Sequence, residues 1–162
     1  MKTLLILRHA KSSWANVNQT DHERPLNGRG KKDAPQVGRV LKEKQITPDL
    51  IITSTAERAL ATAEAAAISS DYDHELKLDG RLYLAPVFTY LAVLRELGTG
   101  PACVMVVGHN PGSEDLVYHL TDEPELMPTA ALACITLPLA HWSELDEKVK
   151  GKLVWSWRPH DE

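Results

Sequence analysis

Three segments of the sequence place cations and imidazoles where phosphoryl chemistry could use them. Arg8 and His9 directly follow one apolar run, Arg58 comes shortly after a second, and His109 follows a third. A phosphoryl group carries about -1.5 to -2 charges near neutral pH and three acceptor oxygens, and an arginine fork can donate two parallel hydrogen bonds to it. A neutral imidazole can attack phosphorus and form a covalent intermediate. The pattern indicates His9 as the attacking group, with the other three residues holding the phosphoryl oxygens.

Each of these residues also has an ordinary structural interpretation. Arg8 could close a strand at the surface, Arg58 could lie on a solvated helix face, and a lone histidine is more often a structural hydrogen-bonding residue than a catalyst. Their joint placement after three apolar runs favours the site, and Ser12 could add a further donor to a bound anion. The seven histidines are scattered without metal-ligand spacing, so we expect neither a metal nor a cofactor.

The apolar runs and the segments between them predict alternating strands and helices. The expected strands span residues 2–7, 49–53, 102–107, 131–137 and 152–157, and the expected helices span 30–44, 57–69, 87–97 and a stretch from Pro111. We expect Pro35 in a first helical turn, Ser54 to Glu57 as a capping box, and Asn110 as an N-cap. Residues 10–29 form a long loop, and residues 71–86 are expected to be irregular.

This alternation predicts an α/β fold, a three-layer α/β/α sandwich with a mostly parallel central sheet. In such sheets ligands bind beyond the carboxyl ends of the strands. That rule selects the segments that carry Arg8 with His9, Arg58, and His109. The convergence of these segments at one edge of the sheet is the main argument for a site.

Composition limits the classes of function. The chain has 162 residues and a formal net charge of -4. This length favours a single domain over residues 1–162, and the mildly acidic balance argues against a nucleic-acid-binding protein. The apolar run before Arg8 is too short for a signal peptide, and no run approaches a membrane span. We expect a cytoplasmic protein with no membrane partner.

Four motifs in order resemble those of the histidine phosphatase superfamily (branch 1), which has the phosphoglycerate-mutase-like fold. They are Leu5-Ile6-Leu7-Arg8-His9-Ala10, Arg24-Pro25-Leu26-Asn27-Gly28-Arg29-Gly30, Ser54-Thr55-Ala56-Glu57-Arg58-Ala59-Leu60-Ala61-Thr62-Ala63 and Gly108-His109-Asn110-Pro111. The short chain and the run from Arg8 to Trp14 look most like the SixA-type phosphohistidine phosphatases. The resemblance implies that His9 is the nucleophile and that Arg8, Arg58 and His109 form the phosphate pocket.

One departure from the family pattern bears on the substrate. Members that cleave ordinary esters carry an acidic proton donor, but the matching stretch, residues 78–84, has Asp79 followed by Gly80 and Arg81. An imidazole leaving group is far less basic than an alkoxide, with a pKa near ~6.5, so phosphohistidine needs no such acid. We therefore expect a phosphorylated protein substrate, such as a histidine phosphotransfer domain. The alternatives are a small phosphorylated metabolite (a sugar phosphate or nucleotide), with Asp79 or Glu57 as the acid, and a non-catalytic phosphate-binding module.

Overall fold

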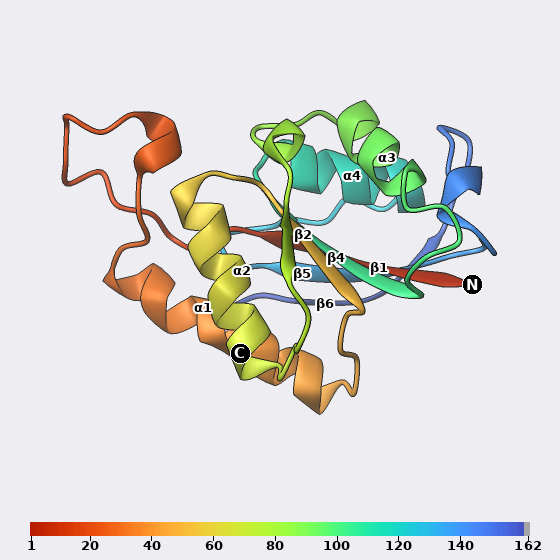
Figure 1. Ribbon diagram of the computed structural model, residues 1–162, viewed down its shortest axis with the longest axis horizontal. Coiled ribbons are helices and arrows are strands. Elements are labelled where there is room, and N and C mark those ends of the chain that lie inside the picture. The colour runs from red at the N-terminus through yellow and green to blue at the C-terminus, as the bar shows by residue number, and fades with distance from the viewer. Residues whose placement is uncertain (161–162) are drawn as a thin grey trace.

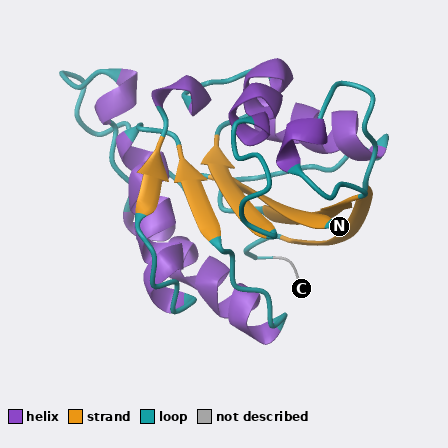
Figure 2. Ribbon diagram, turned by 45° about the vertical axis from the view of Figure 1, so that its right-hand side comes forward, coloured by secondary structure: helices purple, strands orange, loops and turns teal. Residues whose placement is uncertain are grey.

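A computed structural model describes residues 1–160 and contains one six-stranded sheet. Its strand order is β3-β2-β4-β1-β5-β6. The strands are β1 (Lys2–Arg8), β2 (Leu50–Thr53), β3 (Leu76–Leu78), β4 (Cys103–Gly108), β5 (Leu132–Leu137) and β6 (Lys152–Trp157). The first four strands in this order are parallel to one another, whereas β5 pairs antiparallel with both β1 and β6. The parallel strands point to the same end of the sheet in Figure 2, which confirms the mostly parallel sheet.

Helices cover both faces of the sheet. The long helices are α1 (Gly28–Glu43), α2 (Glu57–Ser69), α3 (Val87–Arg95) and α4 (Gly112–Thr121), and the short 3-10 helices are η1 (Asp21–Glu23), η2 (Gly80–Leu82) and η3 (Trp142–Glu144). Helices α1 and α2 lie against one face, and α3 and α4 lie against the other (Figure 1). The three-layer α/β/α sandwich expected from the sequence is confirmed.

The layered packing explains why the strands read as continuous apolar runs. Successive side chains of a strand point to opposite faces of the sheet. On β1, Leu4 and Ile6 join the core beneath α3 and α4, while Leu5 and Leu7 join the core beneath α1 and α2. All four are fully or almost fully buried. This stretch, buried on both faces, therefore has no polar side chain before Arg8, where the strand ends.

Two helix starts differ from the sequence expectation. Helix α1 begins at Gly28, because the Asn27 side chain accepts a hydrogen bond from the Gly30 amide at 2.9 Å and caps it there. Pro35 consequently lies inside the helix instead of in its first turn. Helix α4 begins at Gly112, so Asn110 does not cap it.

The capping box expected from Ser54 to Glu57 was also wrong. Helix α2 begins at Glu57 with Ala56 as its N-cap residue, and no side chain caps it. Ser54 lies too far upstream to serve the helix. Residues 71–86, expected to be irregular, contain β3 and η2. The strand β3 is only three residues long, which is too short to give a clear pattern in the sequence.

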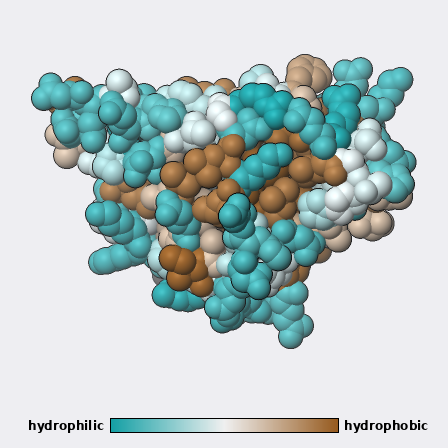
Figure 3. Space-filling model, viewed as in Figure 1, coloured by the Kyte–Doolittle hydropathy of each residue, from teal (hydrophilic) through white to brown (hydrophobic). Residues whose placement is uncertain are grey.

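The β3 edge of the sheet is incompletely covered. Figure 3 shows hydrophobic residues gathered between the two helical layers on the side of the molecule where β3 lies. Leu78 in β3 is 50 % exposed. Short edge strands limit unwanted pairing with other chains. Within residues 1–160, no helix has the length and apolar character needed to cross a membrane.

Candidate active site

The predicted site residues meet at the end of the sheet farthest from the N-terminus (Figure 1). Arg8 is the last residue of β1, Arg58 is the second residue of α2, and His109 directly follows β4. The ring centroids of His9 and His109 lie 5.1 Å apart, and Arg58 Nη2 lies 3.5 Å from His109 Nδ1. The structure therefore brings together all four residues that the sequence singled out, from three elements.

These side chains line a cavity of about 250 Å³. Three arginines and one lysine are among its lining residues, and no aspartate or glutamate lines it among the described residues. The lining residues are Arg8, His9, Lys11, Ser12, Trp14, Arg24, Arg58, Leu84, His109, Asn110 and Thr129. A cavity of this size and charge suits a compact, multiply charged anion.

The backbone after β1 orients His9. Its amide donates to the Gly108 carbonyl at 3.0 Å, and its Nδ1 lies 2.7 Å from the Ala10 carbonyl oxygen. A carbonyl can only accept, so Nδ1 carries the proton and the lone pair lies on Nε2. The Ala10 amide in turn donates to Thr62 Oγ1, which donates to the Arg58 carbonyl. Thr62 thus ties the end of β1 to the first turn of α2.

His109 is held by Ser54 and Arg58. Its Nε2 lies 2.8 Å from Ser54 Oγ, and Arg58 Nη2 faces its Nδ1. Ser54 therefore serves the second histidine rather than the helix that the sequence assigned to it. Only the motif that contains Ser54 signals this role.

Arg24 is a site residue that sequence reasoning did not single out. Its Nε donates to the Ser13 carbonyl at 3.1 Å, and its Nη2 donates to Ser12 Oγ. The indole of Trp14 covers its guanidinium, with Cζ 3.3 Å from the ring centroid. Ser12 therefore reaches the cavity as expected, but as a partner of this arginine. The Arg24-Pro25-Leu26 motif was the available signal.

Glycine is required where the loop after β1 meets α1. A Cβ on Gly30 would lie 2.1 Å from the Lys11 carbonyl oxygen. No side chain fits there, so only glycine lets the helix approach the loop that carries Ser12. This requirement accounts for the glycine that ends the Arg24–Gly30 motif.

Burial keeps both histidines neutral. Burial is the largest cause that lowers the pKa of His9 to about 4, with Arg58 and Arg8 adding to it and the Ala10 carbonyl opposing it. The pKa of His109 falls to about 3, first through burial and then through His9 and Arg58. The positive charges of the arginines lower the pKa of His9, but desolvation lowers it more.

These two pKa values predict a pH dependence of stability. Above pH 6.5 both histidines are neutral in the folded and the unfolded chain. Between about pH 6.5 and 4 the unfolded chain takes up protons that folded His9 and His109 do not, so the free energy of unfolding falls as pH falls. The slope is at most about 1.4 kcal/mol per pH unit for each histidine.

Urea unfolding at pH 7, 6 and 5 measures this slope. His9→Asn should show a shallower loss of stability than the wild type across that range, because one depressed pKa has been removed. Equal slopes for the two proteins would contradict the assignment of a neutral, buried His9.

The two carboxylates considered as proton donors lie outside the cavity lining. Asp79 caps η2 by accepting from the Arg81 amide, and its Oδ2 accepts from Arg81 Nη2 at 2.7 Å. The side-chain hydrogen bond from Arg81 is the largest cause that lowers the pKa of Asp79, and the charge of Arg81 adds to it. Glu57 is exposed at the start of α2. No group of three or more potential metal ligands occurs within residues 1–160.

The fold and this site are those of the histidine phosphatase superfamily. The profile of the histidine phosphatase superfamily (branch 1) matches residues 4–83, and the chain belongs to this superfamily. The SixA protein of Agrobacterium tumefaciens superposes with a TM-score of 0.83 at 27 % identity, covering 98 % of both chains. The protein histidine phosphatase SixA solved with tungstate gives a TM-score of 0.80 at 25 % identity, covering 95 % of each chain.

Relatives found by sequence point to two kinds of protein. An uncharacterised protein of Mycobacterium tuberculosis is 30 % identical over 151 residues, which is 86 % of this chain and 92 % of the relative. The 2,3-bisphosphoglycerate-dependent phosphoglycerate mutase of Bifidobacterium longum is 39 % identical over 70 residues, covering 42 % of this chain but only 28 % of the mutase. The chain is thus similar to the mutase over a minor part of that enzyme.

Proposed function

We propose that this protein is a phosphatase that removes the phosphoryl group from phosphohistidine in a protein, through a covalent phosphohistidine on His9. The observation that carries the proposal is a cationic cavity that holds two neutral imidazoles and no carboxylate among the described residues. Phosphoryl transfer needs positioning and charge stabilisation, which this wall supplies. A substrate whose leaving group needs no proton from a carboxylic acid fits a cavity without a carboxylate.

The reaction divides into two displacements at phosphorus. The Nε2 lone pair of His9 attacks the phosphorus, and the bond from phosphorus to the substrate imidazole nitrogen breaks. That nitrogen keeps the electron pair, and the substrate leaves as a neutral imidazole because its other ring nitrogen already carries a proton. The proton stays on His9 Nδ1, which donates it in a hydrogen bond to the Ala10 carbonyl oxygen at 2.7 Å, and this bond fixes the ring. Water then attacks the phosphorus on His9, so that His9 Nε2 regains its lone pair and inorganic phosphate leaves.

The arginines stabilise the charge on the transferring group. Arg8 Nη1 donates to the Met127 carbonyl at 3.1 Å, while its buried Nε has no partner among residues 1–160. Arg58 presents Nη2 beside His109. His109 Nδ1 accepts from Arg58 in this arrangement, so its donation to a phosphoryl oxygen requires a proton on Nδ1. The bound anion favours that protonation, because an opposite charge raises an imidazole pKa.

The surroundings of the cavity support a protein substrate. Trp14 and Leu84 line the cavity and are 72 % and 56 % exposed, and Val17, in the same loop as Trp14, is 89 % exposed. Exposed apolar side chains beside a polar site are typical of surfaces that contact proteins. The similarity to proteins named SixA, one of them a protein histidine phosphatase, points the same way.

The second candidate is a phosphatase of small phosphate esters, favoured by the partial similarity to phosphoglycerate mutases. It would need Asp79 or Glu57 as a proton donor. Their positions outside the cavity lining count against it. A module that only binds phosphate is less favoured, because binding alone does not need His9 with a free Nε2.

The leaving group distinguishes the two enzymes. Wild-type protein should dephosphorylate a histidine-phosphorylated protein and an aryl phosphate with an acidic phenol, but should turn over alkyl phosphates slowly. Asp79→Asn and Glu57→Gln should each leave these rates nearly unchanged, measured as kcat/KM for the three substrates. General acid catalysis supplies about 10²–10⁴-fold. A loss of that size at Asp79, with good turnover of alkyl phosphates, would favour the ester phosphatase instead.

A further inference from the structure

One carboxylate just outside the cavity joins two of its arginines. Asp21 lies in η1, in the loop at the left of Figure 1. Its Oδ1 accepts from Arg24 Nη1 at 2.9 Å, and its Oδ2 accepts from Arg58 Nη2 at 3.0 Å. Its backbone oxygen also accepts from Arg58 Nη1 at 2.7 Å. Asp21 thereby binds both ends of the Arg58 fork and one end of the Arg24 fork.

A third group meets the same carboxylate. The Tyr83 hydroxyl donates to Asp21 Oδ2. The Tyr83 ring meets the His109 ring edge-on, with centroids 5.4 Å apart. Asp21 therefore connects the loop after β1, the first turn of α2 and the segment after η2, and each of these carries a wall of the cavity.

These bonds leave part of Arg58 available. Its Nη2 has two N–H groups; one binds Asp21, and the other faces His109 Nδ1 at 3.5 Å, a long contact that a bound phosphoryl oxygen can replace. Arginine side chains have many rotamers, and a donor stabilises developing charge only when it is already in place. An arginine held by both terminal nitrogens meets that requirement without reorganising during the reaction.

Asp21 cannot serve as the missing acid. The Tyr83 hydroxyl is the largest cause that holds the pKa of Asp21 well below its usual range, followed among the stabilising groups by Arg24 and Arg58. A carboxylate that stays ionised at every working pH has no proton to donate. Its contribution must come through the residues that it binds.

We propose that Asp21 is a positioning residue, which holds Arg24 and Arg58 in the geometry that phosphoryl transfer to His9 requires. The proposal rests on the function proposed above and adds a residue to it. It also carries an electrostatic cost, because a negative charge beside the two arginines weakens their attraction for an anion. Removing this charge should therefore lower kcat, which depends on how the arginines are positioned, without weakening the binding of a simple anion.

Asp21→Asn tests this opposition, because the amide keeps the shape but replaces one acceptor by a donor. With 4-nitrophenyl phosphate as substrate, kcat should fall by about 10–100-fold, as expected when the catalytic arginines are misplaced. The inhibition constant of inorganic phosphate should stay unchanged or decrease. Asp21→Glu, which restores the charge, should recover part of kcat. The matched control is Asp71→Asn, which removes an exposed ion pair with Lys42 at the end of α2 and should change neither constant.

An unchanged kcat in Asp21→Asn would overturn the proposal. So would a weaker inhibition by phosphate in parallel with the loss of kcat, or failure of both Asp21 variants to fold, because either result assigns a merely structural role. Thermal unfolding of each variant accompanies the kinetics. Failure of the proposed function would appear separately, as wild-type protein that forms no phosphoenzyme on His9.

Discussion

Replacing His9 by alanine is expected to reduce turnover of both phosphohistidine protein and aryl phosphate to below about one thousandth of the wild-type rate, as for other essential nucleophiles. The variant loses the group proposed to accept the phosphoryl group covalently, because the Nδ1 hydrogen bond to the Ala10 carbonyl leaves the Nε2 lone pair of His9 free to attack. Steady-state kinetics with both substrates gives the measurement. Oxyanion binding should persist, since Arg8 and Arg58 remain.

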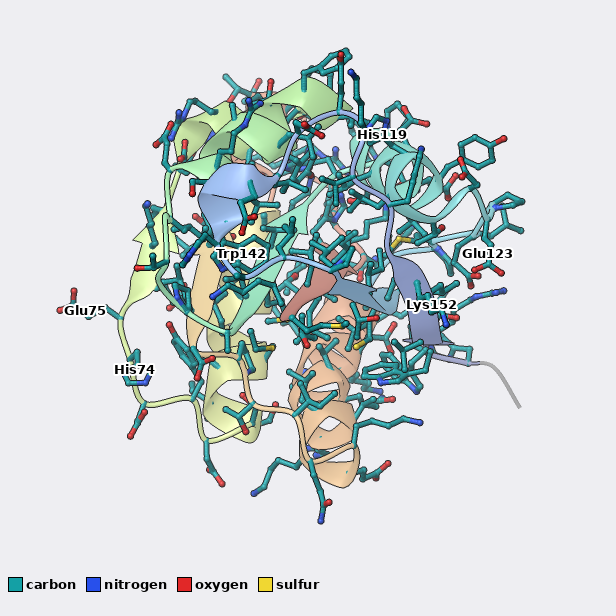
Figure 4. The ribbon with its side chains drawn as sticks, turned by 90° about the vertical axis from the view of Figure 1, so that its right-hand side faces the viewer. His74, Glu75, His119, Glu123, Trp142 and Lys152 are labelled. Atoms are coloured by element: carbon teal, nitrogen blue, oxygen red, sulfur yellow. The ribbon has the colours of Figure 1, made fainter. Side chains whose placement is uncertain are left out.

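A histidine on the surface provides the matched control. The side chain of His74 is 62 % exposed and lies at the periphery of the fold (Figure 4), and His74 is not among the residues that line the cavity. His74→Ala should retain wild-type turnover. More than a tenth of wild-type activity in His9→Ala, with intact folding, would contradict the covalent mechanism.

The second large effect is expected at Arg58. Arg58→Ala removes a donor aimed at the site where charge develops, so kcat/KM should fall by about 10²–10³-fold. Affinity for vanadate and inorganic phosphate should fall as well, because each charge-assisted hydrogen bond contributes about 1.5–3 kcal/mol. Inhibition constants for both anions measure that loss.

Two further variants make the Arg58 result specific. Arg58→Lys keeps the charge but loses the fork that binds Asp21 through both terminal nitrogens, so it should recover only part of the activity. Arg39→Ala removes an exposed arginine of α1 and should have no effect. Full activity in Arg58→Lys would show that charge alone suffices and would contradict the geometric argument.

Much of the fold could be predicted because the strands of the central sheet are buried on both faces. Burial leaves residues 4–7 of β1 and the whole of β4 without charged or polar side chains, so the sequence shows these strands and where they end. Arg8, His9 and His109 stand directly at those ends. The rule that ligands bind at the carboxyl ends of parallel strands then suffices to bring them together.

The residues that sequence reasoning missed act through tertiary contacts. Ser54 fits a capping pattern in the sequence, but in the structure its Oγ is hydrogen-bonded to His109 Nε2 at 2.8 Å. Asp21 lies in a polar loop with no periodicity, and its role depends on Arg58, which is 37 residues away. Neither contact can be predicted from helix or strand patterns, because these patterns reflect only what a residue does within its own helix or strand.

The central claim is that phosphoryl groups pass from a phosphohistidine to His9. Mixing the wild-type protein with a ³²P-labelled histidine-phosphorylated protein, quenching within milliseconds in base and mapping the labelled peptide tests it most directly. The account predicts label on His9 that appears as the substrate loses it and then decays to inorganic phosphate. Release of phosphate with no label ever on His9, or label on another residue, would contradict it.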